Sequence, residues 1–357
     1  MRGAFALLLA SSAFGAQAQR LPGALHAAPT AIAPAALGLA ADPAGLSAPS
    51  NDLAPARSLL EQTAGLAPQE ARLEAALGAA MPAEVSRMSP DAVVDGAQAV
   101  RLANSGQENR GIFALERDGT RRILKVLPFT ESGGAFEGGP PAALRHLRGA
   151  LIGEVFDGPR VLRAGLLERG GEDRSYFIES EELFPGGEGR SLKDLSSDAA
   201  RGKGEAILRI SPATGVEMGR SLARVLAAGV VPKDADFFVA RDGRVAWLDS
   251  NLWTPSSELE NGFPEAAGLE LATLLRRASR AGEGGRAFLL EFLGAWRRAP
   301  LAEDFKLSVL REAFAGDPVR HPGLAARAER EAREALARSG LTPTGTPYEL
   351  VLELYRR

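Results

Sequence analysis

The most informative part of the sequence is Gly229–Trp253, which reads GVVPKDADFFVARDGRVAWLDSNLW. Two short β-rich runs, FFVA and VAWL, flank the dipeptide Asp242-Gly243, which is a strong signal for a hairpin turn. Asp234 and Asp236 come just before the hairpin, and Asp249 comes just after it. Because a hairpin brings its two ends together, we expect these three carboxylates to lie close together at its open end, opposite the turn. A cation, or a phosphate held by a cation, would be favoured there.

Composition narrows the possible classes of protein. The chain has 357 residues, is 45% hydrophobic and 24% charged, and carries a formal net charge of −3. These values are typical of a globular protein, and they do not indicate a nucleic-acid or anionic-membrane partner. Without cysteine, the chain has no disulfide, zinc-thiolate site or cysteine nucleophile. Its histidines at 26, 146 and 321 are scattered, which argues against a histidine metal cluster or a Ser-His-Asp triad.

The first residues predict export. Arg2 is followed by a short apolar run and by Ala16-Gln17-Ala18, a pattern typical of a secretory signal peptide over residues 1–18. The alternative is a disordered alanine-rich start. The apolar run is too short to span a bilayer, and no cysteine follows it, so no membrane anchor is expected. The predicted location is therefore periplasmic or secreted.

Two further segments precede the first strands. Residues 19–51 are rich in alanine and proline and lack periodicity, which predicts a disordered spacer. Leucines then recur at roughly helical spacing from residue 52, and we interpret residues 52–94 as a helical N-terminal extension.

A β-meander is expected next. The runs AVRLA (99–103), GIFALER (111–117) and RRILKVL (121–127) read as three consecutive antiparallel strands. Lys125 is bracketed by apolar residues in the third strand. An ammonium group beside a buried surface calls for a partner anion, because burying a lone charge is costly. The alternative is a lysine on the solvent face of an edge strand.

The order of elements after the meander carries a resemblance. A helix over 141–155, two further strands, a glycine-containing turn and a long helix capped by Ser211 lead to the opening stretch. This succession resembles the protein-kinase-like fold, the family of protein kinases and aminoglycoside phosphotransferases, over about residues 100–296. The resemblance rests on ILKVL, on YFIESEELFPGGEGRSLKDL, on the stretch around Asp249, and on GLELATLLRRA.

The resemblance implies an α+β, two-lobed fold with a small antiparallel β lobe at 95–183 and a larger helical lobe at 184–300. Further helices would follow at 301–357. It also implies ATP and Mg²⁺ or Mn²⁺ as cofactors, with an acceptor substrate or protein partner that the sequence does not identify.

The resemblance also implies roles for individual residues. Lys125 would bind the α- and β-phosphates, and the backbone of Glu181 to Leu183 would meet the adenine. Asp234 would be the catalytic base. The residues that would flank the loop over the nucleotide are Gly106 and Gly111, and those that would hold the metal are Asp236 and Asp249.

The sequence departs from the family pattern at the catalytic loop. No histidine precedes the aspartates, and the segment between Val231 and Phe237 is about three residues shorter than the motif requires. If Asp236 takes the place of the motif's asparagine, the position of the base falls on Val231. Three interpretations stay open, namely an active phosphotransferase, a pseudokinase that binds a nucleotide or partner without turnover, and an unrelated α+β binding protein.

The remaining features indicate ordinary helices. Phe288, Phe292 and Trp296 are spaced as one core face of a helix, and Arg276-Arg277 is interpreted as a solvated helix end. The run over 325–340 predicts a solvent-facing helix with i,i+4 charge pairs.

Overall fold

The computed structural model places all of its described residues in one compact unit, Ser47–Arg357. The described residues are 85–89, 92–103, 111–117, 119–128, 140–169, 173–184, 189–201, 209–234, 236–248, 250, 253–255, 262–316 and 322–357. The predicted signal peptide (1–18) and spacer (19–51) lie outside them, as do Gly106 and Asp249.

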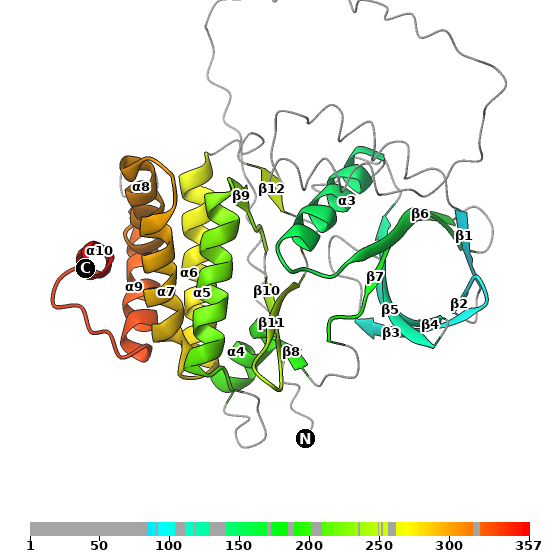
Figure 1. Cartoon of the computed structure of the whole chain (residues 1–357), viewed down its shortest axis with the longest axis horizontal. Helices are drawn as coiled ribbons and strands as arrows, with labels where there is room; N and C mark the ends of the chain where they lie inside the picture. The colour runs from blue at the N-terminus through cyan, green and yellow to red at the C-terminus, as the bar shows by residue number, and fades with distance from the viewer. Residues whose placement is uncertain are drawn as a thin grey trace, which may run out of the picture. The chain divides into compact units, whose positions relative to one another are not determined.

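Seven strands form a closed barrel, seen on the right of Figure 1. Around the barrel the strands follow the order β1-β2-β3-β4-β5-β7-β6, and β1 closes it by pairing with β6 in parallel. The strands are β1 (Val85–Met88), β2 (Val93–Val94), β3 (Ala97–Ala103), β4 (Gly111–Arg117), β5 (Thr120–Pro128), β6 (Val161–Arg169) and β7 (Asp173–Glu181).

The predicted meander is present as β3, β4 and β5, each antiparallel to the next. Two expectations need correction. Residues 85–88 and 93–94, at the end of the segment interpreted as helical, form β1 and β2 instead, and the β region therefore begins before residue 95. The parallel β1–β6 pair also makes the sheet not wholly antiparallel. Residues 85–88 form a strand because their side chains alternate between the two faces: Ser86 and Met88 are buried, whereas Arg87 between them is exposed.

The barrel interior combines an apolar cluster with a buried carboxylate. Phe113, Leu124 and Phe177 belong to its hydrophobic cluster. Glu179 is fully buried and accepts a hydrogen bond from Arg163 Nε at 2.7 Å and one from an Arg122 terminal nitrogen at 3.1 Å. These charge-assisted bonds join β5, β6 and β7 and offset the cost of burying the carboxylate.

Helix α3 (Pro140–Val155) lies against the outer side of the barrel next to β6. Side chains alternate across a strand, so the neighbours of the inward-facing Leu124 and Phe177 point outward. Ile178 on β7 accordingly joins Ala143 and Leu147 of α3 in the main hydrophobic core. The outer barrel face and the helices thus share one apolar cluster.

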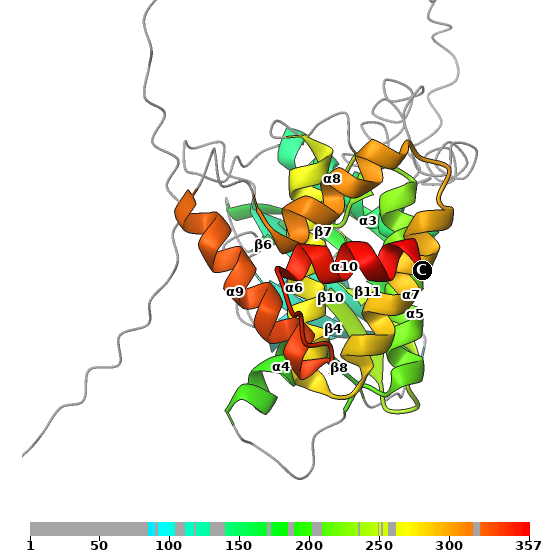
Figure 2. The same ribbon diagram turned by 90° about the vertical axis from the view of Figure 1, so that its left-hand side faces the viewer.

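The rest of the described chain consists of two small sheets and a set of helices, and Figure 2 shows the helices in front of the barrel strands. Strands β11-β10-β8 form one sheet, and β12 pairs with β9. The elements are β8 (Gly189–Ser191), β9 (Val230–Val231), β10 (Asp236–Ala240), β11 (Val245–Leu248), β12 (Thr254–Pro255), α4 (Leu192–Ala200), α5 (Pro212–Ala227), α6 (Phe263–Ala281), α7 (Gly284–Arg298), α8 (Glu303–Phe314), α9 (Pro322–Arg338) and α10 (Pro347–Arg356).

The helices form where the sequence indicates. Ser211 caps α5, with its hydroxyl accepting the Thr214 N–H at 3.1 Å. Phe288, Phe292 and Trp296 are fully buried on one side of α7, as their spacing predicts. Helix α9 carries three i,i+4 Arg–Glu pairs on its surface, including Arg333–Glu329.

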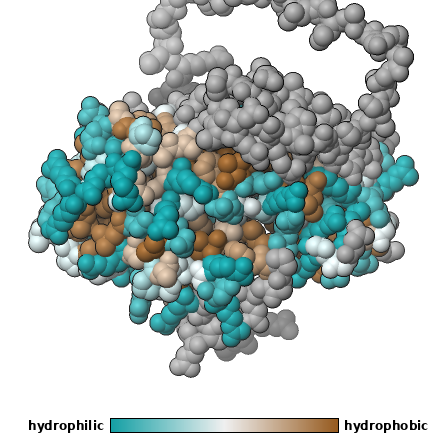
Figure 3. Space-filling view, in the orientation of Figure 1, coloured by the Kyte–Doolittle hydropathy of each residue, from teal (hydrophilic) through white to brown (hydrophobic). Residues whose placement is uncertain are grey.

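The surface carries both hydrophilic and hydrophobic residues. On the face drawn in Figure 3, hydrophilic residues predominate at both ends and hydrophobic residues reach the surface between them. No helix among the described residues has the length and apolar character needed to cross a membrane. The chain is thus a mixed α/β protein with a closed barrel and helices around a shared core.

Candidate functional site

The Asp242-Gly243 turn predicts a two-residue loop in which Phe237 pairs with Leu248 and Asp236 lies beside Asp249. The structure differs by one residue, with Phe237 paired with Trp247, because the loop has three residues and the Ala240 N–H donates to the Arg244 carbonyl at 2.9 Å. Gly243 adopts φ +87°, and the Asp242 carboxylate accepts the Arg244 N–H at 3.1 Å across the turn. Phe237 stacks on Trp247 with ring centroids 3.9 Å apart. This register pairs Asp236 with Leu248 at the end opposite the turn.

Asp236 is buried and already has several partners. It is 4% exposed and accepts the Lys193 N–H at 3.1 Å and the Phe237 N–H at 3.0 Å. The Arg277 guanidinium lies 3.6 Å from its carboxylate. Burial raises the pKa of Asp236 to about 6, and Arg277 and the amide donors oppose that rise. Asp236 therefore holds the first turn of α4, where a carboxylate is favoured by the helix dipole.

Asp234 lies two residues earlier, in an exposed turn with φ +53°. Its N–H donates to the Glu270 carboxylate at 3.2 Å. Glu270 is 7% exposed, and burial raises its pKa to about 7, assisted by the Asp234 charge and opposed by Arg277. A left-handed backbone at a residue other than glycine is strained, and Glu270 helps to hold it.

Glu270 and Arg277 are the site residues that the sequence interpretation missed. Both project from α6, seven residues apart, so they lie on one side two turns from each other. Arg277 was interpreted as part of a solvated helix end, yet its side chain is only 18% exposed and faces Asp236. The available signal was an acid and a base seven residues apart beside the buried Leu271 and Leu274.

Lys125 lies on β5 and points to the outer side of the barrel. It pairs with Ile112 on β4 and with Ile178 on β7, and its flanking residues Leu124 and Val126 face the interior. Lys125 is partly buried, and its charge acts on His146 of α3. This strand is central to the barrel, so Lys125 is not on an edge strand, the alternative that the sequence left open.

The other described residues that were predicted to meet the nucleotide do not present free groups on the outer side of the barrel where Lys125 lies. Gly111 pairs with Val126, so a side chain there would point into the barrel, where a Cβ would lie 2.7 Å from the Phe113 ring. The Glu181 N–H already donates to the Arg160 carbonyl at 2.9 Å. Leu183 precedes Phe184, which adopts φ +54° and packs against Phe238 of the hairpin at 6.0 Å between centroids.

Asp236 as placed suits amide donors and an arginine better than a metal ion. Its oxygens accept two N–H bonds and face Arg277, so a divalent cation would have to displace a positive charge. Within the described ranges, no group of three or more His, Asp or Glu side chains could hold a metal ion. Asp249, the other predicted ligand, lies outside those ranges, and the metal role stays a prediction.

The chain after β11 leads to α3. Leu248 pairs with Asp236, whereas Ser250 lies so close to Gly153 of α3 that an added Cβ would be 2.2 Å from the Ser250 Cβ. The short segment from Leu248 to Ser250 therefore connects the open end of the hairpin to α3.

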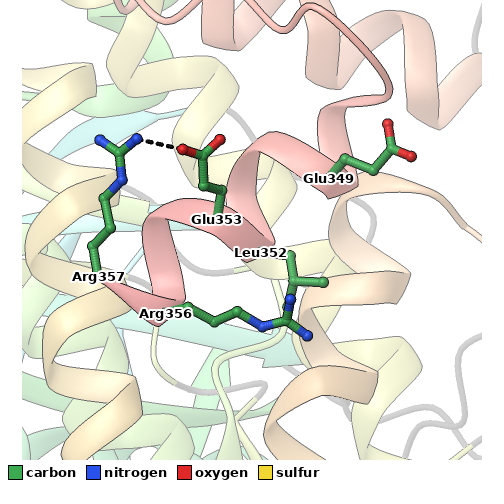
Figure 4. Close-up of a pocket in the computed structure, with 5 residues that line it drawn as sticks. All are labelled: Glu349, Leu352, Glu353, Arg356 and Arg357. Atoms are coloured by element: carbon green, nitrogen blue, oxygen red, sulfur yellow. Dashed lines mark hydrogen bonds and ion pairs between the residues drawn. The ribbon is translucent and has the colours of Figure 1, made fainter.

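A surface hollow on α10 is not part of this site. It is lined by Glu349, Leu352, Glu353, Arg356 and Arg357, as Figure 4 shows. All five residues project from a single helix, and Glu353 pairs with Arg357. A ligand site usually gathers polar groups from several elements, which this hollow does not.

Comparisons with known proteins give little further information. No protein-family model matches the chain, and no curated protein matches it. Among solved structures, the chain is similar to WaaP in complex with acyl carrier protein. The two are 20% identical with a TM-score of 0.30, and the match covers 68% of this chain and 90% of that chain. A similarity with so low a TM-score carries no argument about fold or function.

Proposed function

We propose that the chain is a two-lobed, protein-kinase-like protein that binds ATP. The observation that carries this proposal is the relation between β5 and β7. Lys125 points to the outer side of the barrel, the side on which α3 lies. Arg122, three positions earlier on the same strand, pairs with Glu181, where the predicted adenine-binding segment begins. At about 3.3 Å per residue, these positions are about 10 Å apart. That spacing suits a ligand with a ring at one end and phosphates at the other.

The activity proposed is ATP-dependent phosphotransfer with Asp234 as the catalytic base. Support comes from its placement, because its side chain is exposed while its main chain is held by Glu270. An accessible carboxylate on a fixed loop is what a general base requires. The acceptor remains unidentified. Mg²⁺ or Mn²⁺, when bound, would neutralise phosphate charge, and the described residues assign it no ligand set.

One observation favours a second candidate, a pseudokinase that binds a nucleotide or a partner without turnover. Asp236, which the resemblance assigns to the metal, uses its carboxylate to hold the first turn of α4 and faces Arg277. A residue committed in this way would not position a metal–nucleotide complex for transfer.

Export is part of the proposal. The predicted signal peptide implies a mature chain that begins near Gln19 and acts in the periplasm or outside the cell. Mass spectrometry of the exported fraction measures the N-terminus directly. An intact Met1 on material from the cytoplasm would contradict export.

Thermal unfolding with ATP, with and without Mg²⁺ or Mn²⁺, tests nucleotide binding. At a hundredfold excess over Kd a bound ligand should add about 2.7 kcal/mol of stability. Lys125→Gln should remove most of this gain. Arg280→Gln, which also deletes one positive charge but from an exposed position on α6, should keep it. No stabilisation of the wild type under any of these conditions would overturn the proposal.

Turnover separates the two candidates. ATP consumption by the wild type that disappears in Asp234→Asn, with binding retained, supports phosphotransfer. Binding without consumption by the wild type supports the pseudokinase.

A further inference from the structure

The segment between β9 and β10 is held at both of its ends. Val231 is buried and pairs with Thr254 of β12, and its carbonyl accepts the Lys233 N–H at 2.9 Å. At the other end, Asp236 is buried and begins β10. Asp234 lies between these two anchors, so its backbone conformation decides where the middle of the segment points.

That conformation is one that few side chains adopt. Asp234 has φ +53°, in the left-handed region, and such a backbone persists only where the surrounding structure holds it. Glu270 supplies a holding contact, because its carboxylate accepts the Asp234 N–H at 3.2 Å. Glu270 is only 7% exposed, so water cannot readily take the place of this bond, and the low local dielectric strengthens it.

Helix α6 fixes the position of the Glu270 carboxylate. Leu271 and Leu274, which follow Glu270 on the helix, are fully buried. At Gly268 the helix approaches α8 so closely that an added Cβ would lie 2.8 Å from the Ala313 backbone nitrogen. Close-packed helices leave little room for a shift, so Glu270 is a fixed point against which the segment is held.

We propose that Glu270 is a positioning residue for Asp234, because its bond to the Asp234 N–H keeps that residue left-handed and thereby fixes the direction of its carboxylate. The direction of the Cα–Cβ bond follows the backbone dihedral angles, so relaxation to an extended or right-handed backbone would turn the carboxylate elsewhere. Glu270 itself would neither touch the acceptor nor transfer a proton. This inference rests on the proposed phosphotransfer and adds a residue on which the base depends.

The first test is kinetic and uses the full chain. Glu270→Ala removes the acceptor of the hydrogen bond and should lower kcat on the order of 10²-fold, the cost of misplacing a catalytic group. The KM for ATP should stay within about twofold, because the residues proposed to bind ATP lie on the barrel strands. Glu270→Gln keeps an acceptor oxygen and should recover most of the lost kcat. Glu265→Gln, which deletes a carboxylate from the first turn of the same helix, is the control and should match the wild type.

The second test needs no turnover. Hydrogen exchange followed by NMR should show slow exchange of the Asp234 N–H in the wild type, although the residue itself is exposed. In Glu270→Ala the exchange should become fast in the segment between β9 and β10, while the amides of α6 and α7 keep their protection.

Each outcome decides a different point. Rapid exchange of the Asp234 N–H in the wild type, or an unchanged kcat in Glu270→Ala, would overturn the inference and leave phosphotransfer in place. A Glu270→Gln variant no more active than Glu270→Ala would also overturn it, because the accepted bond would then not be what matters. Protection that depends on Glu270, in a wild type that consumes no ATP, would support the positioning contact and overturn phosphotransfer. The wild-type exchange measurement decides the contact even if Glu270→Ala fails to fold.

Discussion

The Arg277 guanidinium lies 3.6 Å from the Asp236 carboxylate, and the two side chains are 18% and 6% exposed. The contact joins α6 to the first residue of the hairpin strand β10. Two turns earlier on α6, Glu270 accepts the Asp234 N–H and holds the backbone of that residue. A single helix thus fixes both aspartates that precede the hairpin.

Removing Arg277 should destabilise the protein strongly. Arg277→Leu leaves two buried carboxylates, Asp236 and Glu270, without their shared cation, and we expect a loss of about 3–5 kcal/mol at pH 7.5. The loss should shrink at pH 5, where the carboxylates can take up protons. Urea unfolding at both pH values measures it. The control is Arg280→Leu at an exposed position, expected to change stability by no more than about 0.5 kcal/mol. Equal effects of the two variants would show that the contact contributes nothing.

Glu270 should give the folded protein a pH dependence of its own. Its pKa rises from 4.5 unfolded to about 7 folded, so the folded state binds the extra proton between these values. Stability from this group is therefore greatest below pH 4.5 and is lost as the pH rises through 7. Glu270→Gln keeps an acceptor for the Asp234 N–H and should flatten the unfolding free energy between pH 5 and pH 8. A variant with the wild-type slope would contradict the assignment.

Much of this arrangement is readable in local sequence signals. The dipeptide Asp242-Gly243 predicts the hairpin turn, whereas the pairing of Asp236 with Leu248 follows from a three-residue loop that the dipeptide alone does not specify. Ser211 before proline marks the start of α5, and the spacing of aromatic residues marks the buried side of α7. These signals act over a few residues, which is why the sequence alone predicts them.

The closure of the barrel and the contacts of α6 depend on residues far apart in the chain. Strand β1 pairs with β6 about 80 residues later, and no local pattern encodes that partner. One local signal was available. Asp95-Gly96 has φ of +46° and +83° between two short β runs, so it forms the two-residue turn of the β2–β3 hairpin, in which Val94 pairs with Ala97. Arg277 and Glu270 could be assigned only once the hairpin was seen to lie against α6.

The buried glutamate of the barrel should be as important for stability as its apolar core. Glu179→Ala leaves Arg122 and Arg163 facing each other without the carboxylate that they share, and we expect a loss of about 3–5 kcal/mol. Chemical denaturation followed by circular dichroism measures it. Glu168→Ala is the control, because its pair with Arg87 at 3.6 Å lies at the surface, with side chains 34% and 85% exposed, and should contribute about 0–1 kcal/mol. Comparable losses for both would mean that burial of the Glu179 network adds no stability.

Two glycines on neighbouring helices should respond oppositely to the same substitution. In α5, a Cβ on Gly219 would lie 2.3 Å from the Phe288 carbonyl oxygen and 3.0 Å from the Phe292 nitrogen, both in the backbone of α7. Backbone cannot move aside as a side chain can, so Gly219→Ala should force the helices apart and cost about 1–3 kcal/mol. In α7, a Cβ on Gly294 would meet only the end of Arg298 at 3.5 Å, an ordinary contact. Gly294→Ala should therefore raise stability by up to about 1 kcal/mol, the difference in helix propensity. Thermal unfolding of the two variants measures both signs, and a stabilised Gly219→Ala would show that α5 and α7 do not approach each other this closely.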